Sequence, residues 1–109
     1  MVLFISFQNY KGDKIFCYDT VAVAYNNTYY IGEVQKIHGD KREVEIKFMK
    51  RARNGYYSWP RKEDVDTVDV DFIFFSNVLV VGAGKEGGGY VDCEEDIAEL
   101  FDKYKNDYM

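Results

Sequence analysis

Aromatic side chains gather in one stretch of the sequence, residues 21–60, at the points where short strands are expected to turn. They are Tyr25, Tyr30, Phe48, Tyr56, Tyr57 and Trp59. An aromatic face attracts a cation through its quadrupole and can also stack on a nucleic-acid base. The stretch therefore predicts recognition of a peptide or nucleic-acid ligand at an aromatic-lined rim, and it does not identify the ligand.

Basic residues are interleaved with these aromatics and offer a second chemistry. Residues 36–53 carry seven Lys or Arg against three Asp or Glu, a local charge of +4. The candidates for phosphate contact, in the loop 47–62, are Lys47, Lys50, Arg51, Arg53 and Arg61. Phosphate contacts beside stacked bases are typical of single-strand binding. The acidic residues of 63–71 would repel a phosphate backbone, and the net charge of −5 disfavours a general nucleic-acid binder, so a solvated loop is favoured.

Catalytic and metal chemistry have little support. The single histidine, His38, lies at a turn with no serine or cysteine near it in the sequence. Cys17 and Cys93 lack the spacing of a zinc site, and we expect two buried free thiols in a reducing compartment, with a disulfide as the alternative. The glycine-rich residues 82–89 lack the GxxxxGK[ST] pattern of a phosphate-binding loop and predict a hairpin. We therefore expect no enzymatic activity, no cofactor and no metal ion.

The elements that must position these side chains are short strands. Strands are predicted over residues 20–25, 28–37, 42–49, 56–59 and 70–81, the last interrupted near Ser76 and Asn77. Asn26 and Asn27 predict a tight turn, because asparagine tolerates left-handed backbone. Gly32 predicts a bulge or a sharp coil. In the third strand, charged residues alternate with an inward-facing row of Val44, Ile46 and Phe48.

The segments outside this stretch are expected to cover it within one domain of residues 1–109. The apolar residues 2–7 predict an added strand, and residues 9–13 predict a turn. Residues 61–71 are polar and predict a loop or a helical turn. Residues 92–107 predict a helix that begins with a capping-box-like pair, Asp92 and Glu95. Its apolar stripe consists of Ile97, Leu100, Phe101, Tyr104 and Tyr108. No stretch is apolar enough to span a membrane, so no membrane partner is expected.

The order of the central strands and turns resembles a Tudor domain, a member of the SH3-like barrel group. The residues that carry the resemblance are VAVAY (21–25), YYIGEV (29–34), VEIKF (44–48) and NGYYSWP (54–60). The chain is also similar to Tudor-like modules of uncharacterised or mobile-element-derived animal proteins, which share the YIGEV and WP signatures. The resemblance covers about half the chain. It implies a mainly β fold with an SH3-like barrel over residues 13–81. The added N-terminal strand and the C-terminal amphipathic helix, predicted from their own sequences, lie outside the resemblance.

The same resemblance implies a reader of methylated lysine or arginine in protein tails, and hence chromatin and an intracellular, nuclear location. Tudor cages draw aromatics from the first two strands and from the end of the third strand with its loop. Carried over by position, the pocket would consist of Tyr25, Tyr30, Phe48 and Tyr56 or Tyr57, with Trp59 as a further candidate or as a lid over the barrel end. The rim acceptors for a remaining N–H would be Asn26, Asn54 or Glu33.

Three alternatives stay open at this point. The aromatics can be ordinary barrel packing or form a simpler groove. The basic loop can bind nucleic acid, or an exposed strand edge can pair with another protein chain or a second copy.

Overall fold

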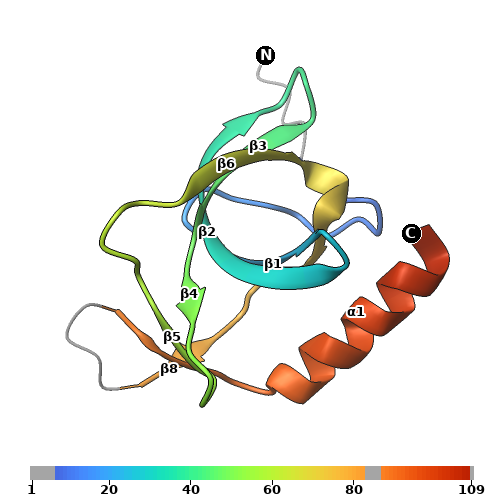
Figure 1. Ribbon diagram of the computed structural model, residues 1–109. Helices are drawn as coiled ribbons and strands as arrows, with labels where there is room; N and C mark the ends of the chain where they lie inside the picture. Colours follow the sequence, from blue (N-terminus) through green and yellow to red (C-terminus); the bar gives the residue numbers. More distant parts are fainter. Residues whose placement is uncertain (1–6, 83–86, 109) are drawn as a thin grey trace.

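The computed structural model describes residues 7–82 and 87–108, which form two antiparallel sheets and one helix (Figure 1). The five-stranded sheet has the order β6-β3-β2-β1-β7. Its strands are β1 (Thr20–Tyr25), β2 (Thr28–His38), β3 (Glu43–Phe48), β6 (Val65–Asp69) and β7 (Ile73–Phe75). The four-stranded sheet has the order β4-β5-β9-β8, with β4 (Lys50–Arg51), β5 (Tyr56–Ser58), β8 (Val80–Val81) and β9 (Gly89–Val91). The predicted mainly β class with a C-terminal helix is confirmed.

The five-stranded sheet curls strongly, and Figure 1 shows β1, β2, β3 and β6 bending round a common centre. Its edge strands β6 and β7 are joined by a short 3-10 helix, η1 (Val70–Phe72). Within the described residues no strand pairing links β6 to β7, so hydrogen bonds do not close this sheet into a barrel.

The hairpin between β1 and β2 has the predicted turn. Asn26 and Asn27 have φ angles of 50° and 62°, which asparagine tolerates better than most residues. Tyr25 pairs with Thr28 across the turn. This tight connection fixes the register and leaves a tyrosine at the very end of β1.

Pairing of β2 with β3 corrects one prediction. The register shift lies between Val34 and Lys36, so the bulge is not at Gly32. A Cβ at Gly32 would lie 2.5 Å from Ile46 Cγ2 and 2.8 Å from the backbone oxygen of Lys47. Glycine is required there because the neighbouring strand β3 leaves no room for a side chain.

The two faces of the five-stranded sheet bury separate cores. The inner core, inside the curl, consists of Ile15, Val21, Val23, Val34, Val44, Ile46, Phe48, Val68, Val70 and Ile73. It includes the predicted inward row of β3. The outer core consists of Ala22, Ala24, Ile31, Met49, Tyr57, Phe74, Val78, Val91, Ile97, Phe101 and Tyr104. Alternate residues of β1 therefore serve different cores, and the outer core joins both sheets to the helix.

The predicted fourth strand belongs to the other sheet. β5 pairs with β4 and β9, and β6 occupies the position beside β3. β6 lies in the segment that we predicted as a loop or helical turn. Among its five residues only Val68 is buried, so its sequence does not alternate like that of an internal strand. The predicted strand over residues 70–81 begins as η1 and continues as β7 and β8, and its predicted interruption near Ser76 and Asn77 is confirmed. β8 and β9 pair as a hairpin at this position requires, with Val81 opposite Tyr90.

Helix α1 (Glu94–Tyr108) follows the predicted apolar stripe, with Ile97, Phe101 and Tyr104 buried. Its start differs by one residue from the predicted cap. The carbonyl oxygen of Cys93 accepts hydrogen bonds from the backbone N–H groups of Asp96 (3.0 Å) and Ile97 (3.3 Å). Cys93 therefore occupies the N-cap in place of Asp92.

Both cysteines, Cys17 and Cys93, are free and exposed, so the prediction of buried thiols is wrong. Cys93 is exposed because it caps a helix, and Cys17 lies in a surface turn. The predicted strand over residues 2–7 falls outside the described residues except for Phe7. None of the helices in residues 7–82 and 87–108 is long and apolar enough to cross a membrane.

Candidate functional site

A hollow of about 200 Å³ opens at one end of the curled sheet, lined by Tyr25, Tyr30, Phe48, Asp64 and Asp66. The rings of Tyr25 and Tyr30 have centroids 6.1 Å apart and planes inclined at 66°. The rings of Tyr30 and Phe48 are also 6.1 Å apart, inclined at 73°. We call this site the aromatic hollow. It contains three of the predicted pocket residues, arranged edge to face.

The alternation of β1 and β3 explains why these rings meet. Val21 and Val23 face the inner core, and Tyr25 is the next residue on that face. Tyr30 lies directly across from Val23 on β2. Both tyrosines stand at the open end, with 43% and 41% of their surfaces exposed, whereas Phe48 is 8% exposed. The tyrosines therefore form walls, and Phe48 forms a floor that also belongs to the core.

Two carboxylates complete the lining. The backbone N–H of Phe48 donates to the carbonyl oxygen of Asp64 at 2.7 Å, which fixes this segment beside β3. Asp66 lies opposite Ile46 in the pairing of β6 with β3. Neither carboxylate forms an ion pair with any residue that the structure describes. The hollow thus combines aromatic faces with uncompensated negative charge, a combination suited to a cation.

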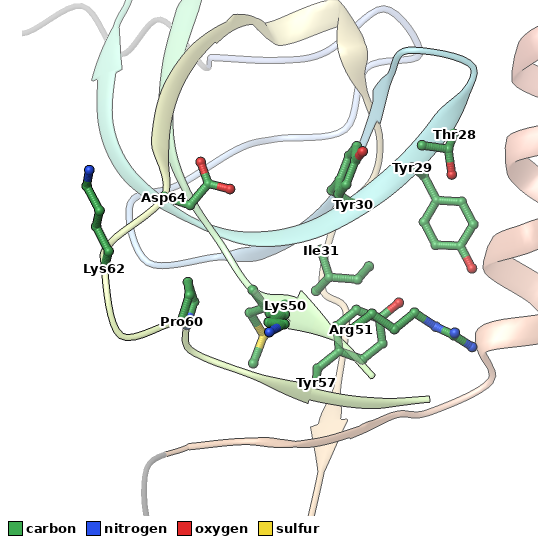
Figure 2. A pocket seen from close by; sticks show the side chains of 11 residues that line it. Thr28, Tyr29, Tyr30, Ile31, Lys50, Arg51, Tyr57, Pro60, Lys62 and Asp64 are labelled. Carbon is green, nitrogen blue, oxygen red and sulfur yellow. The ribbon is translucent and has the colours of Figure 1, made fainter. Parts of the chain in front are cut away.

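A larger cleft of about 610 Å³ lies between the two sheets (Figure 2). It is lined by Thr28, Tyr29, Tyr30, Ile31, Met49, Lys50, Arg51, Tyr57, Pro60, Lys62 and Asp64. These residues come from β2, from Met49 and the strands β4 and β5 that follow it, and from the segment 60–64 that leads into β6. Tyr30 and Asp64 line both spaces, so the cleft and the aromatic hollow adjoin.

Polar groups tie the helix to one side of the cleft. The carboxylate oxygen Glu94 Oε1 accepts hydrogen bonds from the hydroxyls of Tyr57 (2.7 Å) and Tyr29 (3.3 Å). The same oxygen accepts from Nε of Arg51 at 3.0 Å. These bonds connect α1, β2 and both strands of the β4-β5 hairpin, so this cluster holds the second sheet against the first.

The cluster shifts the acid–base behaviour of its members. Burial would raise the pKa of Glu94, but the guanidinium of Arg51 and the tyrosine hydroxyls hold it below its ordinary value. Burial raises the pKa of Tyr57 and of Tyr29, and the neighbouring carboxylate raises both further. Glu94 is therefore ionised and both tyrosines are neutral donors at neutral pH.

The remaining predicted aromatics do not reach the aromatic hollow. Tyr57 lies in the cleft and is buried. The ring of Tyr56 packs on that of Tyr90, with centroids 5.4 Å apart. The ring of Trp59 lies under the ammonium of Lys47, 4.7 Å from its centroid. The reason is that β5 belongs to the second sheet.

The predicted rim residues are not among those lining either space. Asn26 is exposed in the β1-β2 turn. Asn54 supports the β4-β5 loop, where its side-chain oxygen accepts from the backbone N–H of Tyr56 at 3.1 Å. Glu33 accepts from the side-chain amide of Gln35 at 3.0 Å.

Sequence reasoning missed the two acidic residues of the aromatic hollow. Asp64 and Asp66 are two positions apart, which places them on one face of an extended segment. That spacing was visible in the sequence, but it becomes informative only when β6 is known to pair with β3.

No protein-family model matches this chain. Comparisons with curated proteins and with solved structures also find no match. The conclusions on function therefore depend on the geometry of the residues.

The predicted phosphate-contacting residues have different environments. They are Lys47, Lys50, Arg51, Arg53 and Arg61. Lys47 is ion-paired with Glu63 at 3.6 Å, and Arg51 is ion-paired with Glu94 at 3.0 Å. The other three are exposed, and of these Lys50 lines the cleft. Within residues 7–82 and 87–108, no group of three or more His, Cys, Asp or Glu side chains is placed to hold a metal ion.

Proposed function

We propose that this protein is a non-catalytic binding module whose aromatic hollow takes a methylated lysine or arginine side chain. The observation that carries the proposal is the ring of Tyr30, which is inclined to those of Tyr25 and Phe48. Asp64 and Asp66 line the same hollow. A methylated ammonium or guanidinium is a bulky, weakly hydrated cation. Each aromatic face attracts such a cation by about 0.5–2 kcal/mol.

The carboxylates favour ligands that keep an N–H group. A carboxylate accepts a charge-assisted hydrogen bond from a monomethyl or dimethyl ammonium, or from a dimethylated guanidinium. Trimethyl-lysine has no N–H to donate. We therefore propose that the hollow prefers dimethyl-arginine or partly methylated lysine to trimethyl-lysine.

The proposed fold behind this function is an open SH3-like, Tudor-like barrel. Its support is the curl of the five-stranded sheet and the position of η1, which joins the edge strands β6 and β7. In such an arrangement the hollow lies at the barrel mouth, where a side chain can enter and its peptide backbone stays outside.

The test compares peptides that differ only in methylation. Tyrosine ring signals in NMR spectra are followed as each peptide is added, because Tyr25 and Tyr30 line the hollow. We expect methylated peptides to shift these signals and unmodified ones not to. Tyr30→Ala should weaken binding roughly twofold to thirtyfold, the equivalent of losing one cation–π contact.

Tyr18→Ala is the matched control, because Tyr18 is 73% exposed and lies outside the hollow. It should leave the affinity unchanged. An equal response to methylated and unmodified peptides would contradict the proposal.

A further inference from the structure

The groove formed by the aromatic hollow and the cleft has opposite charges at its two ends. Asp66 lies at the hollow, and Asp64 lies where the two spaces meet, so that it lines both. Lys50 and Lys62 line the cleft and are exposed. Neither lysine forms an ion pair with a residue of the described part of the chain. A ligand that fills both spaces therefore meets a negative end and a positive end.

Arg51 does not change this polarity, because Glu94 neutralises it. Its guanidinium donates to both carboxylate oxygens, at 3.0 Å and 3.4 Å. Figure 2 shows the Arg51 side chain directed toward the helix, away from Lys62 and Pro60 on the opposite side of the cleft. The free positive charge of the cleft thus belongs to the two lysines.

The remaining surface of the cleft suits an extended peptide. Pro60 supplies partly exposed apolar surface beside the buried side chains of Ile31 and Met49. The hydroxyls of Tyr29 and Tyr57 are already bonded to Glu94. The volume of about 610 Å³ is three times that of the hollow, so it can accept several side chains. Bases would need free aromatic faces for stacking. In the cleft Tyr57 is buried and Tyr29 packs against Phe101, which leaves the exposed ring of Tyr30 for stacking and disfavours a nucleic acid.

We infer, on the basis of the proposed function, that the ligand is a peptide whose methylated residue is flanked by aspartate or glutamate. The methylated cation enters the aromatic hollow between Tyr25 and Tyr30, and the flanking carboxylates lie in the cleft against Lys50 and Lys62. Recognition then requires both a modification and an acidic sequence around it.

The experiment measures the affinity of the whole chain for two dimethyl-arginine peptides that differ only in having Glu or Gln around the modified residue. Each exposed ion pair contributes about 0.2–1 kcal/mol, so two should favour the Glu peptide by roughly twofold to thirtyfold at low salt. The advantage should shrink as salt is added. It should disappear in the double variant Lys50→Gln/Lys62→Gln, which should still bind the Gln peptide normally.

Lys36→Gln/Lys41→Gln is the control, since both lysines are exposed and neither lines the groove. It should retain the preference for the Glu peptide. Equal affinity for the two peptides, or a preference that survives loss of Lys50 and Lys62, overturns the inference and leaves the methyl-binding proposal standing.

Failure of the proposed function gives a different pattern. In that case the unmodified Glu peptide binds as tightly as the methylated one, and Tyr30→Ala has no effect. A third outcome also overturns the inference. If a single-stranded oligonucleotide displaces the peptide, and binds the double variant Lys50→Gln/Lys62→Gln more weakly than the wild type, the cleft is assigned to nucleic acid.

Discussion

Glu94 shows how one residue can connect function to stability. It lies in the first turn of α1, where its negative charge is favourable to the helix dipole. It also accepts hydrogen bonds from Tyr57, Tyr29 and Arg51, three residues that line the cleft. Its side chain is 23% exposed, and the hydrogen bonds from the two tyrosines are partly buried. The shape of the cleft therefore depends on one carboxylate.

This arrangement predicts a pH-dependent effect of Glu94→Gln. The pKa of Glu94 is lowered in the folded state, so its contribution to stability is present above its unfolded value of about 4.3 and is lost as the pH falls through the folded value. At neutral pH the variant should unfold with a free energy lower by about 1–3 kcal/mol. Below the folded pKa the difference from the wild type should vanish. Urea denaturation of the variant and the wild type, at neutral pH and at a pH below the folded pKa, measures this difference in the free energy of unfolding.

Glu95→Gln is the matched control. Glu95 lies in the same first turn but is exposed, so it shares the dipole effect and lacks the hydrogen-bonded cluster. It should cost only about 0.3–1 kcal/mol. If the two variants had the same stability at neutral pH, the cluster around Glu94 would be energetically unimportant.

At the scale of single elements, β2 and β3 depend on one glycine. Gly32→Ala would place a methyl group 2.5 Å from Ile46 Cγ2 and 2.8 Å from a backbone oxygen of β3. The backbone atom cannot yield without opening the pairing of the two strands. We expect a loss of about 1–3 kcal/mol in the free energy of unfolding, although alanine is ordinarily preferred to glycine in a strand.

Gly39→Ala provides the comparison, because no atom of the described residues lies within 4 Å of a Cβ at that position. It should be neutral or slightly stabilising in the same denaturation experiment. A stable Gly32→Ala variant would mean that β3 can shift away from β2, and the floor of the aromatic hollow at Phe48 should then be displaced too.

The elements also show what the sequence could and could not predict. β1, β2 and β3 are internal strands, and their alternation with strong β-formers made them visible. β6 is an edge strand with one buried residue, so its sequence is that of a polar loop. Missing β6 had a consequence for the site, because Asp64 and Asp66 were not recognised as part of it.

At the scale of the whole molecule, the outer core predicts that the two sheets and the helix unfold together. Ile31 of β2, Tyr57 of β5 and Phe101 of α1 are all buried in this one cluster. The ring of Phe101 lies 5.5 Å from those of Tyr29 and Phe74, which belong to the five-stranded sheet. The four-stranded sheet and α1 thus pack on the five-stranded sheet through the outer core, whereas the five-stranded sheet also has the inner core.

Two probes can test this cooperativity. Trp59, the single tryptophan, follows β5 directly and reports on the second sheet by fluorescence, while far-UV circular dichroism reports on the helix and both sheets. In urea the two signals should change at the same midpoint.

Phe101→Ala should lower both midpoints equally, by the equivalent of about 3–5 kcal/mol, because the ring is 5% exposed and its loss leaves a cavity between helix and sheet. Glu99→Ala, an exposed change on the same helix, should leave both midpoints in place. If the fluorescence transition came first, the second sheet would be an independent unit, and the cleft could open without unfolding the sheet that carries the aromatic hollow.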